Sequence, residues 1–392
     1  MRAWVLLAAL GAGCSPGGGD LPHAPMPASH DEPGTVVAEL EPKPTQAENA
    51  RAPAEQAPDA AEDARSPSVA MAEGDEQDAP PSTEPDPLTM PASRSTSIGP
   101  PTSGRLEGGV ALPLRAPGLL FNPSKDPGSR FGTVELVQGL VRAAAAVERA
   151  QPGAPVTVGD LAREGVGDIP GHASHRTGRD VDVLFYLRRE GEENEDGEPF
   201  VPAKAIPLDP EGRGTDYGDL ADPADDVPVR IDVERTWAFV AALLADEHAD
   251  VQRILIVEHL RERLLEEARR VEASPAVVQR FAEITCQPRF PHDDHMHIRV
   301  FCSAEDLGAG CQDTPPLFPW RKQELAAAGV KPVLAKAGGN DERPATPKKK
   351  PTLKTLAQAR AEAGPMHEDV VEFLDRRESW AKRPRPGRRW CR

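Results

Sequence analysis

The chain has 392 residues, of which 43 are proline and only 4% are aromatic, and its formal charge at neutral pH is −17. The many prolines and few aromatic residues exclude a packed core along the whole length, so we expect fewer folded domains than the length alone would allow. The acidic balance argues against a partner made of nucleic acid, which normally meets a basic face, and no apolar run is long enough to cross a bilayer as a helix.

Residues 1–14 have the pattern of a secretory signal peptide. Arg2 supplies a positive charge, and residues 4–10 form an apolar stretch that is too short for a membrane span. The segment ends in Gly11-Ala12-Gly13-Cys14, which resembles the box that directs lipid attachment in bacterial lipoproteins. We therefore expect a lipidated Cys14 and a membrane-anchored chain in the periplasm or cell envelope. An ordinary cleaved signal is the alternative, because both classes have small residues before the cut.

Both flanks of the chain differ in composition from its middle. Residues 15–106 are rich in Pro, Ala, Ser, Asp and Glu and have no helical or strand period, which predicts a disordered linker that tethers the folded part. Residues 331–392 form a basic tail that contains Lys348-Lys349-Lys350. We interpret this tail as solvated, with contact to an anionic wall polymer or lipid as the alternative.

Residues 107–330 have the apolar periodicity of a folded domain. Steps of three and four residues predict helices over 134–147, 236–245, 260–271 and 275–281. Runs of β-branched and apolar residues predict strands over 156–158, 181–186, 251–257 and 295–301. Residues 188–225 are polar and rich in Gly and Pro, so we expect a long surface excursion that could form a wall of a cleft. The expected fold class is α+β, with a central antiparallel sheet and flanking helices.

Two short segments, far apart in the sequence, carry a set of residues that suits one metal ion. The first is Gly171–Asp182, with His172, His175, Asp180 and Asp182, and the second is His292–Arg299, with His295 and His297. Alternation of side chains along a strand places His295, His297 and Arg299 on one face and likewise pairs Asp180 with Asp182. A catalytic zinc takes three protein ligands and keeps one position for water. A surface histidine cluster without an ion is the alternative.

These segments resemble a known family. His172-Ala-Ser-His175-Arg-Thr-Gly178-Arg-Asp-Val-Asp182 and His292-Asp-Asp-His295-Met-His297-Ile-Arg299 are similar to the motifs of the penicillin-insensitive murein endopeptidases, within the zinc peptidases of the lysostaphin, D-alanyl-D-alanine peptidase and hedgehog group. The resemblance covers about residues 108–316. It implies one zinc ion bound by His175, Asp182 and His297, with His172 as a further candidate. It also implies a catalytic His295, as base or electrostatic stabiliser, and places His292 near the site.

The same resemblance implies a metallo-endopeptidase that hydrolyses peptidoglycan cross-links between D-alanine and meso-diaminopimelate. One alternative is a D,D-carboxypeptidase that trims stem peptides, and another is a non-catalytic cell-wall-binding protein. Carboxypeptidases of the group use a Glu upstream of the last histidine, whereas this chain has His295 and two aspartates there, which favours the endopeptidase.

Several charged residues of the two motifs are candidates for supporting roles. Asp180, Asp293 and Asp294 could orient ligand imidazoles. Arg299, near the site, and Arg179 could hold a substrate carboxylate, and a solvated surface position is the alternative for each.

Four cysteines remain if Cys14 is lipidated: Cys286, Cys302, Cys311 and Cys391. An even number in an exported chain predicts disulfides, and four cysteines allow three pairings. The short spacing favours Cys302 with Cys311, which leaves Cys286 with Cys391 and would tie the tail to the domain. A thiolate metal site is the alternative, but the spacing fits no familiar zinc pattern.

Overall fold

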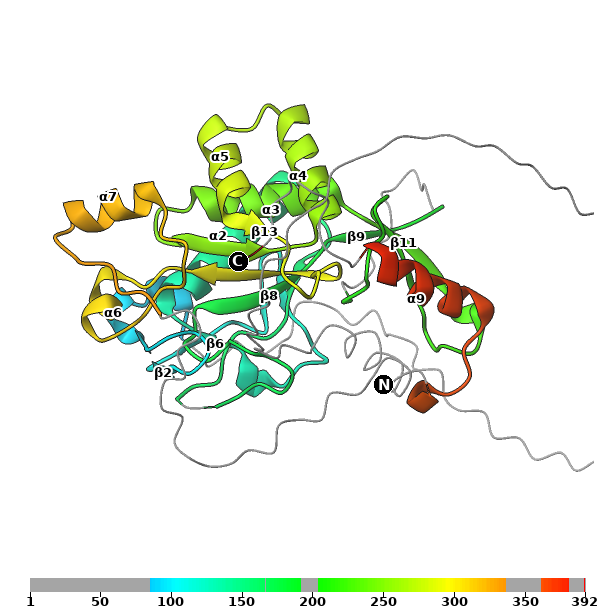
Figure 1. The fold of residues 1–392 in the computed structure, drawn as a ribbon, viewed down its shortest axis with the longest axis horizontal. Helices are drawn as coiled ribbons and strands as arrows, with labels where there is room; N and C mark the ends of the chain where they lie inside the picture. The colour runs from blue at the N-terminus through cyan, green and yellow to red at the C-terminus, as the bar shows by residue number, and fades with distance from the viewer. Residues whose placement is uncertain (1–84, 166, 192–203, 336–360, 381–390, 392) are drawn as a thin grey trace, which may run out of the picture. The chain divides into compact units, whose positions relative to one another are not determined.

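The computed structural model of the chain describes residues 85–165, 167–191, 204–335, 361–380 and 391 (Figure 1). The predicted signal peptide, Cys14, residues 15–84 of the predicted linker and Lys348-Lys349-Lys350 lie outside these residues. Within the described part, none of the helices is both long and apolar enough to cross a bilayer.

A seven-stranded sheet forms the centre of the fold, with the strand order β13-β12-β14-β8-β7-β5-β4. Its strands are β4 (Arg115–Ala116), β5 (Leu119–Phe121), β7 (Val156–Val158), β8 (Asp180–Leu184), β12 (Val251–Leu255), β13 (Thr285–Cys286) and β14 (His295–Val300). The central pairs β12–β14, β14–β8 and β8–β7 are antiparallel, whereas β12–β13 and β5–β7 are parallel. The α+β prediction is confirmed, and the two parallel pairs are an addition to the expected antiparallel sheet.

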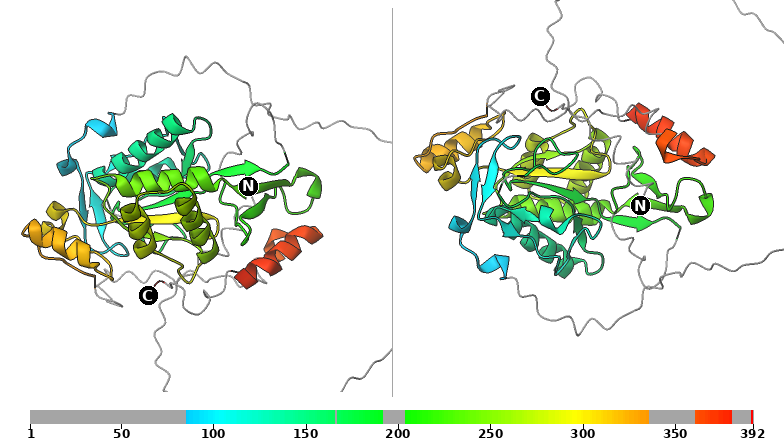
Figure 2. Two further views of the ribbon diagram at one scale, coloured as in Figure 1. Left: turned by 90° about the horizontal axis from the view of Figure 1, so that it is seen from above. Right: turned by 90° about the horizontal axis from the view of Figure 1, so that it is seen from below.

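Four helices cover one face of this sheet (Figures 1 and 2). They are α2 (Val134–Ala150), α3 (Val233–Ala245), α4 (Glu258–Arg270) and α5 (Pro275–Ile284). Their apolar stripes join the inward side chains of the strands in one core, to which α2 contributes Leu136, Val137 and Leu140, all fully buried. The periodicity that predicts these helices therefore reflects burial against the sheet.

The folded part begins earlier than the predicted boundary at residue 107. Two 3-10 turns, η1 (Pro87–Thr89) and η2 (Ala92–Arg94), precede the hairpin of β1 (Thr96–Ile98) and β2 (Arg105–Glu107). Ser95 Oγ accepts a 2.9 Å hydrogen bond from Val134 N at the start of α2. Composition did not reveal that this segment is folded, because much of it is attached to the domain by hydrogen bonds and it has no periodic pattern of apolar residues.

The predicted excursion over residues 188–225 contains regular structure within its described residues. Strands β9 (Leu187–Arg189), β10 (Arg213–Asp216) and β11 (Val227–Ile231) form an antiparallel sheet in the order β10-β11-β9. Helix α9 (Glu368–Trp380) lies beside these strands (Figures 1 and 2). A small core joins it to the loop after β10, formed by Tyr217, Leu220, Val370, Phe373 and Leu374. The prediction of a solvated tail is therefore wrong for residues 368–380.

The remaining elements are short. They are the pair β3 (Val110–Ala111) and β6 (Phe131–Gly132), the turns η3 (Pro127–Ser129) and η4 (Pro223–Asp225), and the helices α6 (Ala304–Gly308) and α7 (Pro319–Ala327). Disulfides join Cys302 to Cys311 and Cys286 to Cys391, so the favoured pairing is confirmed. The second disulfide connects the C-terminal end of the chain to the edge strand β13.

Candidate metal centre

The two histidine segments meet because β8 and β14 are neighbours in the sheet. In the register of this pair His297 lies opposite Asp182, and Arg299 lies opposite Asp180. The alternate side chains face the other way into the core, where Val181, Val183, Met296 and Ile298 are buried. Strand alternation therefore places the polar set on one face of the sheet, as the sequence predicts.

A tight loop brings His175 to the same face before β8 begins. Gly178 has a φ of +70°, and a Cβ there would lie 2.7 Å from Leu106 Cδ1, so only glycine fits this turn without a shift. His175 itself has a φ of +68°, a conformation that is costly for a residue other than glycine. Such backbone strain is common where a side chain must point at a functional site.

Three lone-pair atoms converge on one point. The distance from His175 Nε2 to His297 Nδ1 is 3.1 Å, from His297 Nδ1 to Asp182 Oδ1 3.1 Å, and from His175 Nε2 to Asp182 Oδ1 3.3 Å. Tetrahedral ligands about 2.0–2.2 Å from a zinc ion lie roughly 3.3–3.6 Å from one another. The triangle is thus close to the size that a zinc ion requires, and its sides would lengthen by at most a few tenths of an ångström to hold one.

The outer nitrogens define which ring atoms can bind a metal. His175 Nδ1 lies 2.7 Å from the carbonyl oxygen of Leu161, and His297 Nε2 lies 2.8 Å from Asp180 Oδ1. Both partners are acceptors, so these outer nitrogens carry the protons. When both rings are neutral, the inner nitrogens present lone pairs to each other and to the Asp182 carboxylate. These three electron-pair donors repel one another without an ion and suit a divalent cation. The Leu161 carbonyl and the Asp180 carboxylate would orient the two rings, as residues behind metal-binding histidines commonly do.

His172 borders the triangle. Its Nδ1 lies 3.5 Å from Asp182 Oδ2, and its Nε2 lies 3.2 Å from Asp160 Oδ2. Ligand atoms of His172, His175 and Asp182 all lie within 4.8 Å of one another, so this second set of three could also hold an ion. The two sets share His175 and Asp182. The shorter and more equal distances favour His297 as the third ligand, with His172 beside it.

His295 lies at the open side of the cluster. Its Nδ1 is 2.6 Å from Asp294 Oδ1, and its Nε2 is 3.6 Å from Asp182 Oδ1. Burial lowers the pKa of His295, but Asp294 and Asp182 outweigh it and raise the pKa to about 9. The ring is therefore an imidazolium at neutral pH in this structure, which favours proton donation over the role of a base.

The carboxylates of the cluster are ionised. Burial would raise the pKa of Asp182, yet the neighbouring imidazoles of His175, His295 and His172 hold the pKa well below its ordinary value. Burial would likewise raise the pKa of Asp180, but Arg299 and His297 lower it. A fully charged Asp182 is what a metal ligand requires.

His292 lies near the site, as predicted, but its ring points to a different partner. Its Nδ1 lies 2.8 Å from the carbonyl oxygen of Phe290, and its ring centroid is 4.8 Å from that of His295. Burial, together with the charges of His295 and His297, lowers the pKa of His292 to about 3. A neutral ring at this position adds no charge beside the cluster.

The two arginines suggested as substrate anchors are engaged inside the protein. Arg179 is fully buried and donates to Ser97 Oγ, Asp313 Oδ1 and the carbonyl oxygens of Val300 and Gln312. An anchoring role for Arg179 is therefore wrong. Arg299 donates from Nε to Asp180 Oδ1 at 2.6 Å and so positions the carboxylate behind His297.

Sequence reasoning missed Asp160 and Lys125. Asp160 receives a 2.6 Å hydrogen bond from Ser129 Oγ, and its other oxygen lies 2.7 Å from Lys125 Nζ and close to His172. Asp160 could have been found, because it follows the predicted strand 156–158, which pairs with β8. Lys125 had no such signal, and its half-exposed ammonium provides a positive charge at the rim of the cluster.

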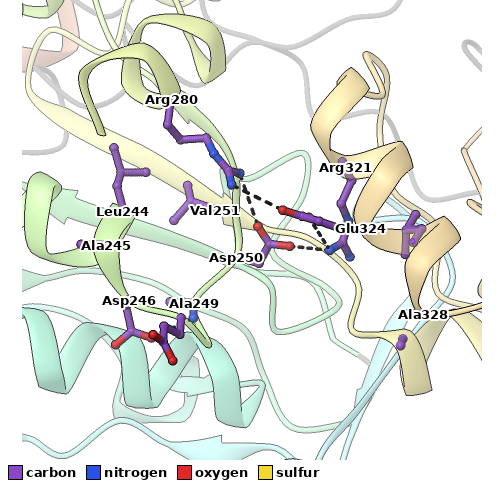
Figure 3. Close-up of a pocket in the computed structure, with 13 residues that line it drawn as sticks. Leu244, Ala245, Asp246, Ala249, Asp250, Val251, Arg280, Arg321, Glu324 and Ala328 are labelled. Atoms are coloured by element: carbon purple, nitrogen blue, oxygen red, sulfur yellow. Dashed lines mark hydrogen bonds and ion pairs between the residues drawn. The ribbon is translucent and has the colours of Figure 1, made fainter. Parts of the chain in front are cut away.

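A separate pocket of about 560 Å³ lies away from these residues, between α3, α5 and α7 (Figure 3). Asp250 Oδ2 lies 2.5 Å from Arg321 Nη1, and Asp250 Oδ1 lies 3.5 Å from Arg280 Nη1. Glu324 contacts both arginines. Both acids among these four residues pair with an arginine. Their carboxylates therefore do not converge on a shared point as the possible metal ligands around Asp182 do.

Comparisons with known proteins agree with the motifs. A family model described as penicillin-insensitive murein endopeptidase matches residues 97–201, which include the first histidine segment. A relative of that name from Klebsiella pneumoniae is 30% identical over 238 residues, 58% of this chain and 75% of the relative. Relatives of the same name from Yersinia pestis and Escherichia coli are 29% and 27% identical over 231 and 237 residues, 58% of this chain in both cases and 74% and 75% of the relatives.

Proposed function

The chain belongs to the penicillin-insensitive murein endopeptidase family of peptidases, and from that premise we propose that it uses one zinc ion to hydrolyse the peptide cross-links of peptidoglycan. The finer assignment is cleavage between D-alanine and meso-diaminopimelate. The observation that carries the metal assignment is the triangle of His175 Nε2, Asp182 Oδ1 and His297 Nδ1, with sides of 3.1–3.3 Å.

The donor set supports zinc among the divalent cations. Two neutral imidazoles and one carboxylate are typical ligands of a catalytic zinc, whereas magnesium and calcium prefer sites built from oxygen alone. His175, Asp182 and His297 would hold the ion, and His172 would lie next to it. When bound, zinc supplies an activated water at neutral pH and polarises the scissile carbonyl.

The protein's own contribution to the reaction is centred on His295. Asp294 holds the proton of Nδ1, so Nε2 is the atom of this ring that can exchange a proton with a substrate. Nε2 lies beside Asp182 on the partly exposed side of the cluster. A charged ring there stabilises negative charge on the carbonyl oxygen as it develops and can give its proton to the departing amine.

The location we propose follows from residues 1–14 and from the cysteines. A lipidated Cys14 would hold the enzyme in the periplasm at a membrane surface, with the peptidoglycan as its substrate. The two disulfides support an exported protein, because such bonds persist in oxidising compartments.

The test is digestion of purified peptidoglycan sacculi by the full chain with zinc, followed by separation of the soluble fragments by mass. We expect cross-linked dimers to decrease while monomers increase, and a chelator to stop the reaction until zinc is restored. Loss of terminal D-alanine alone would instead identify a carboxypeptidase, and unchanged fragments would identify a wall-binding protein; either outcome contradicts the proposal.

A further inference from the structure

Asp293, in the middle of the second histidine segment, is held by the C-terminal helix α9. Arg377 donates from Nε to Asp293 Oδ2 at 2.9 Å and from Nη2 to Asp293 Oδ1 at 2.8 Å. Trp380 Nε1 adds a third hydrogen bond to Oδ2 at 3.0 Å. Both members of the ion pair are buried, with side-chain exposures of 8% for Arg377 and 1% for Asp293. A bidentate pair of this kind fixes orientation as well as charge.

The loop that carries Asp293 is also fixed through its backbone. The carbonyl oxygen of His292 accepts a 3.1 Å hydrogen bond from Val257 N, and that of Asp293 accepts a 2.8 Å bond from Leu208 N. His292 has a φ of +54°, a conformation that persists only where the surroundings enforce it. Helix α9 adds to these backbone contacts the hydrogen bonds that fix the Asp293 side chain.

Helix α9 is itself anchored at its start and along its apolar face. At its start, His367 N donates to the carbonyl oxygen of Leu220, and the apolar residues of α9 pack on Tyr217 and Leu220. Beyond its end, Cys391 is bonded to Cys286, and Cys391 N donates to the carbonyl oxygen of Gln287. The contacts of α9 with Tyr217 and Leu220 therefore hold Arg377 at a defined place.

The neighbour of Asp293 is the carboxylate that orients His295. Asp294 Oδ1 lies 2.6 Å from His295 Nδ1, so a displacement of the loop would move His295 Nε2 relative to Asp182. We propose that Arg377 is a positioning residue, which acts through Asp293 to keep the loop His292–His295 in the geometry that catalysis requires. This inference rests on the proposed function, in which His295 exchanges the proton.

The experiment compares Arg377→Met with Arg376→Met in the full chain. Arg376 is the matched control, because it lies on the same helix, is 59% exposed and pairs only loosely with Glu372, at 3.9 Å. With a dimeric muropeptide as substrate, we expect Arg377→Met to lower kcat by about 10- to 100-fold, the scale of a small misplacement of a catalytic group. KM and zinc content should change little, because the proposed metal ligands belong to β8, β14 and the His175 loop.

A second variant makes the test independent of folding defects in the first. Asp293→Asn keeps the shape of the side chain and weakens the pair from the other side. We expect it to lower kcat in the same way, and the double variant to lose no more than about the larger single loss, because the two residues act as one unit. Arg377→Lys, which keeps the charge without the bidentate fit, should recover part of the activity.

Hydrogen exchange separates this inference from the proposed function. In the metal-free protein, Arg377→Met should speed amide exchange at residues 292–295, whereas Arg376→Met should not. This readout stands even if the wild-type protein cleaves no muropeptide. Wild-type kcat in folded Arg377→Met, or unchanged exchange in that loop, would overturn the positioning role while leaving the peptidase assignment intact.

Discussion

Two clusters of charged side chains in this domain differ in how their charges are balanced. Around Asp250, two carboxylates face two guanidinium groups, and the pairs neutralise one another (Figure 3). Around Asp182, a carboxylate and two imidazoles turn lone pairs toward a common point. The first arrangement is complete as it stands, whereas the second would be completed by the cation that we propose.

This difference separates a stabilising cluster from a functional one more reliably than the size of a cavity does. The pocket of about 560 Å³ lies at the balanced cluster, which is formed by Asp250, Arg280, Arg321 and Glu324. A strongly shifted pKa is also an incomplete guide, because structural ion pairs shift pKa values as well. What distinguishes the candidate metal centre is that the outer nitrogens of His175 and His297 face the acceptors Leu161 and Asp180, which leaves the inner nitrogens available as ligands.

The largest expected effect comes from removing one of the converging atoms. His297→Ala should abolish stoichiometric zinc binding and lower peptidase activity by at least about 1000-fold, because the ion both activates water and polarises the carbonyl. Metal analysis and muropeptide digestion measure the two losses. Arg280→Ala, in the balanced cluster, is the control and should keep both properties. Retained activity in His297→Ala would remove this residue from the ligand set.

A smaller effect, on zinc affinity, is expected from Asp180, which contacts the outer nitrogen of His297. Asp180→Asn should weaken zinc affinity by about 10- to 100-fold, since the acceptor that directs the His297 proton outward becomes weaker. The control is Asp313→Asn, another buried aspartate, which accepts hydrogen bonds from Arg179 and from the backbone N–H of Cys302. Competition with a chelator of known affinity measures both variants. Equal affinities in the two would show that Asp180 does not support the ligand.

A substitution in the balanced cluster around Asp250 is expected to lower the stability of the protein without changing its activity. Arg321→Met removes the 2.5 Å contact with Asp250 and a hydrogen bond to the Cys302 carbonyl oxygen. We expect the free energy of unfolding to fall by about 1–3 kcal/mol, with zinc content and activity per folded molecule unchanged. Urea unfolding beside the exposed control Lys322→Met measures the loss. A drop in activity without a drop in stability would mean that this cluster takes part in function.

The mildest effect is a gradual dependence of the stability of the metal-free protein on pH. Because Asp294 and Asp182 raise the pKa of His295 from 6.5 to about 9, the folded state holds this proton more tightly than the unfolded chain does. Its contribution to stability is fully present below pH 6.5 and is lost as the pH rises through about 9. Thermal unfolding across this range should show the decline, and His295→Gln should flatten it. A decline of equal size in the variant would assign it to other groups.

The sequence could predict which side chains share a face at the candidate metal centre, because alternation along a strand is a local rule. Alternation along two strands places Asp182 and His297 outward, and the buried Met296 and Ile298 identify the opposite face as core. The register that sets His297 opposite Asp182 was not predictable in the same way. It results from the pairing of strands more than a hundred residues apart, which only the whole fold determines.

The two misjudged regions were missed for different reasons, since distant polar partners order the first one and an apolar face orders much of the second. Ser95 caps α2 and Ser97 receives a hydrogen bond from Arg179, contacts that leave no period in the sequence. In α9 the apolar residues Val370, Phe373 and Leu374 do follow helical spacing and could have been recognised within the basic tail. The pairing of Arg377 with Asp293 could not, because one charged residue does not specify its partner.

The most direct measurement is a crystal structure of the zinc-loaded protein with anomalous diffraction at the zinc edge. We predict one strong anomalous peak, about 2.0–2.2 Å from His175 Nε2, Asp182 Oδ1 and His297 Nδ1, with a remaining coordination position open toward His295. A peak that any of these three atoms fails to reach, or zinc bound only elsewhere on the chain, would contradict it.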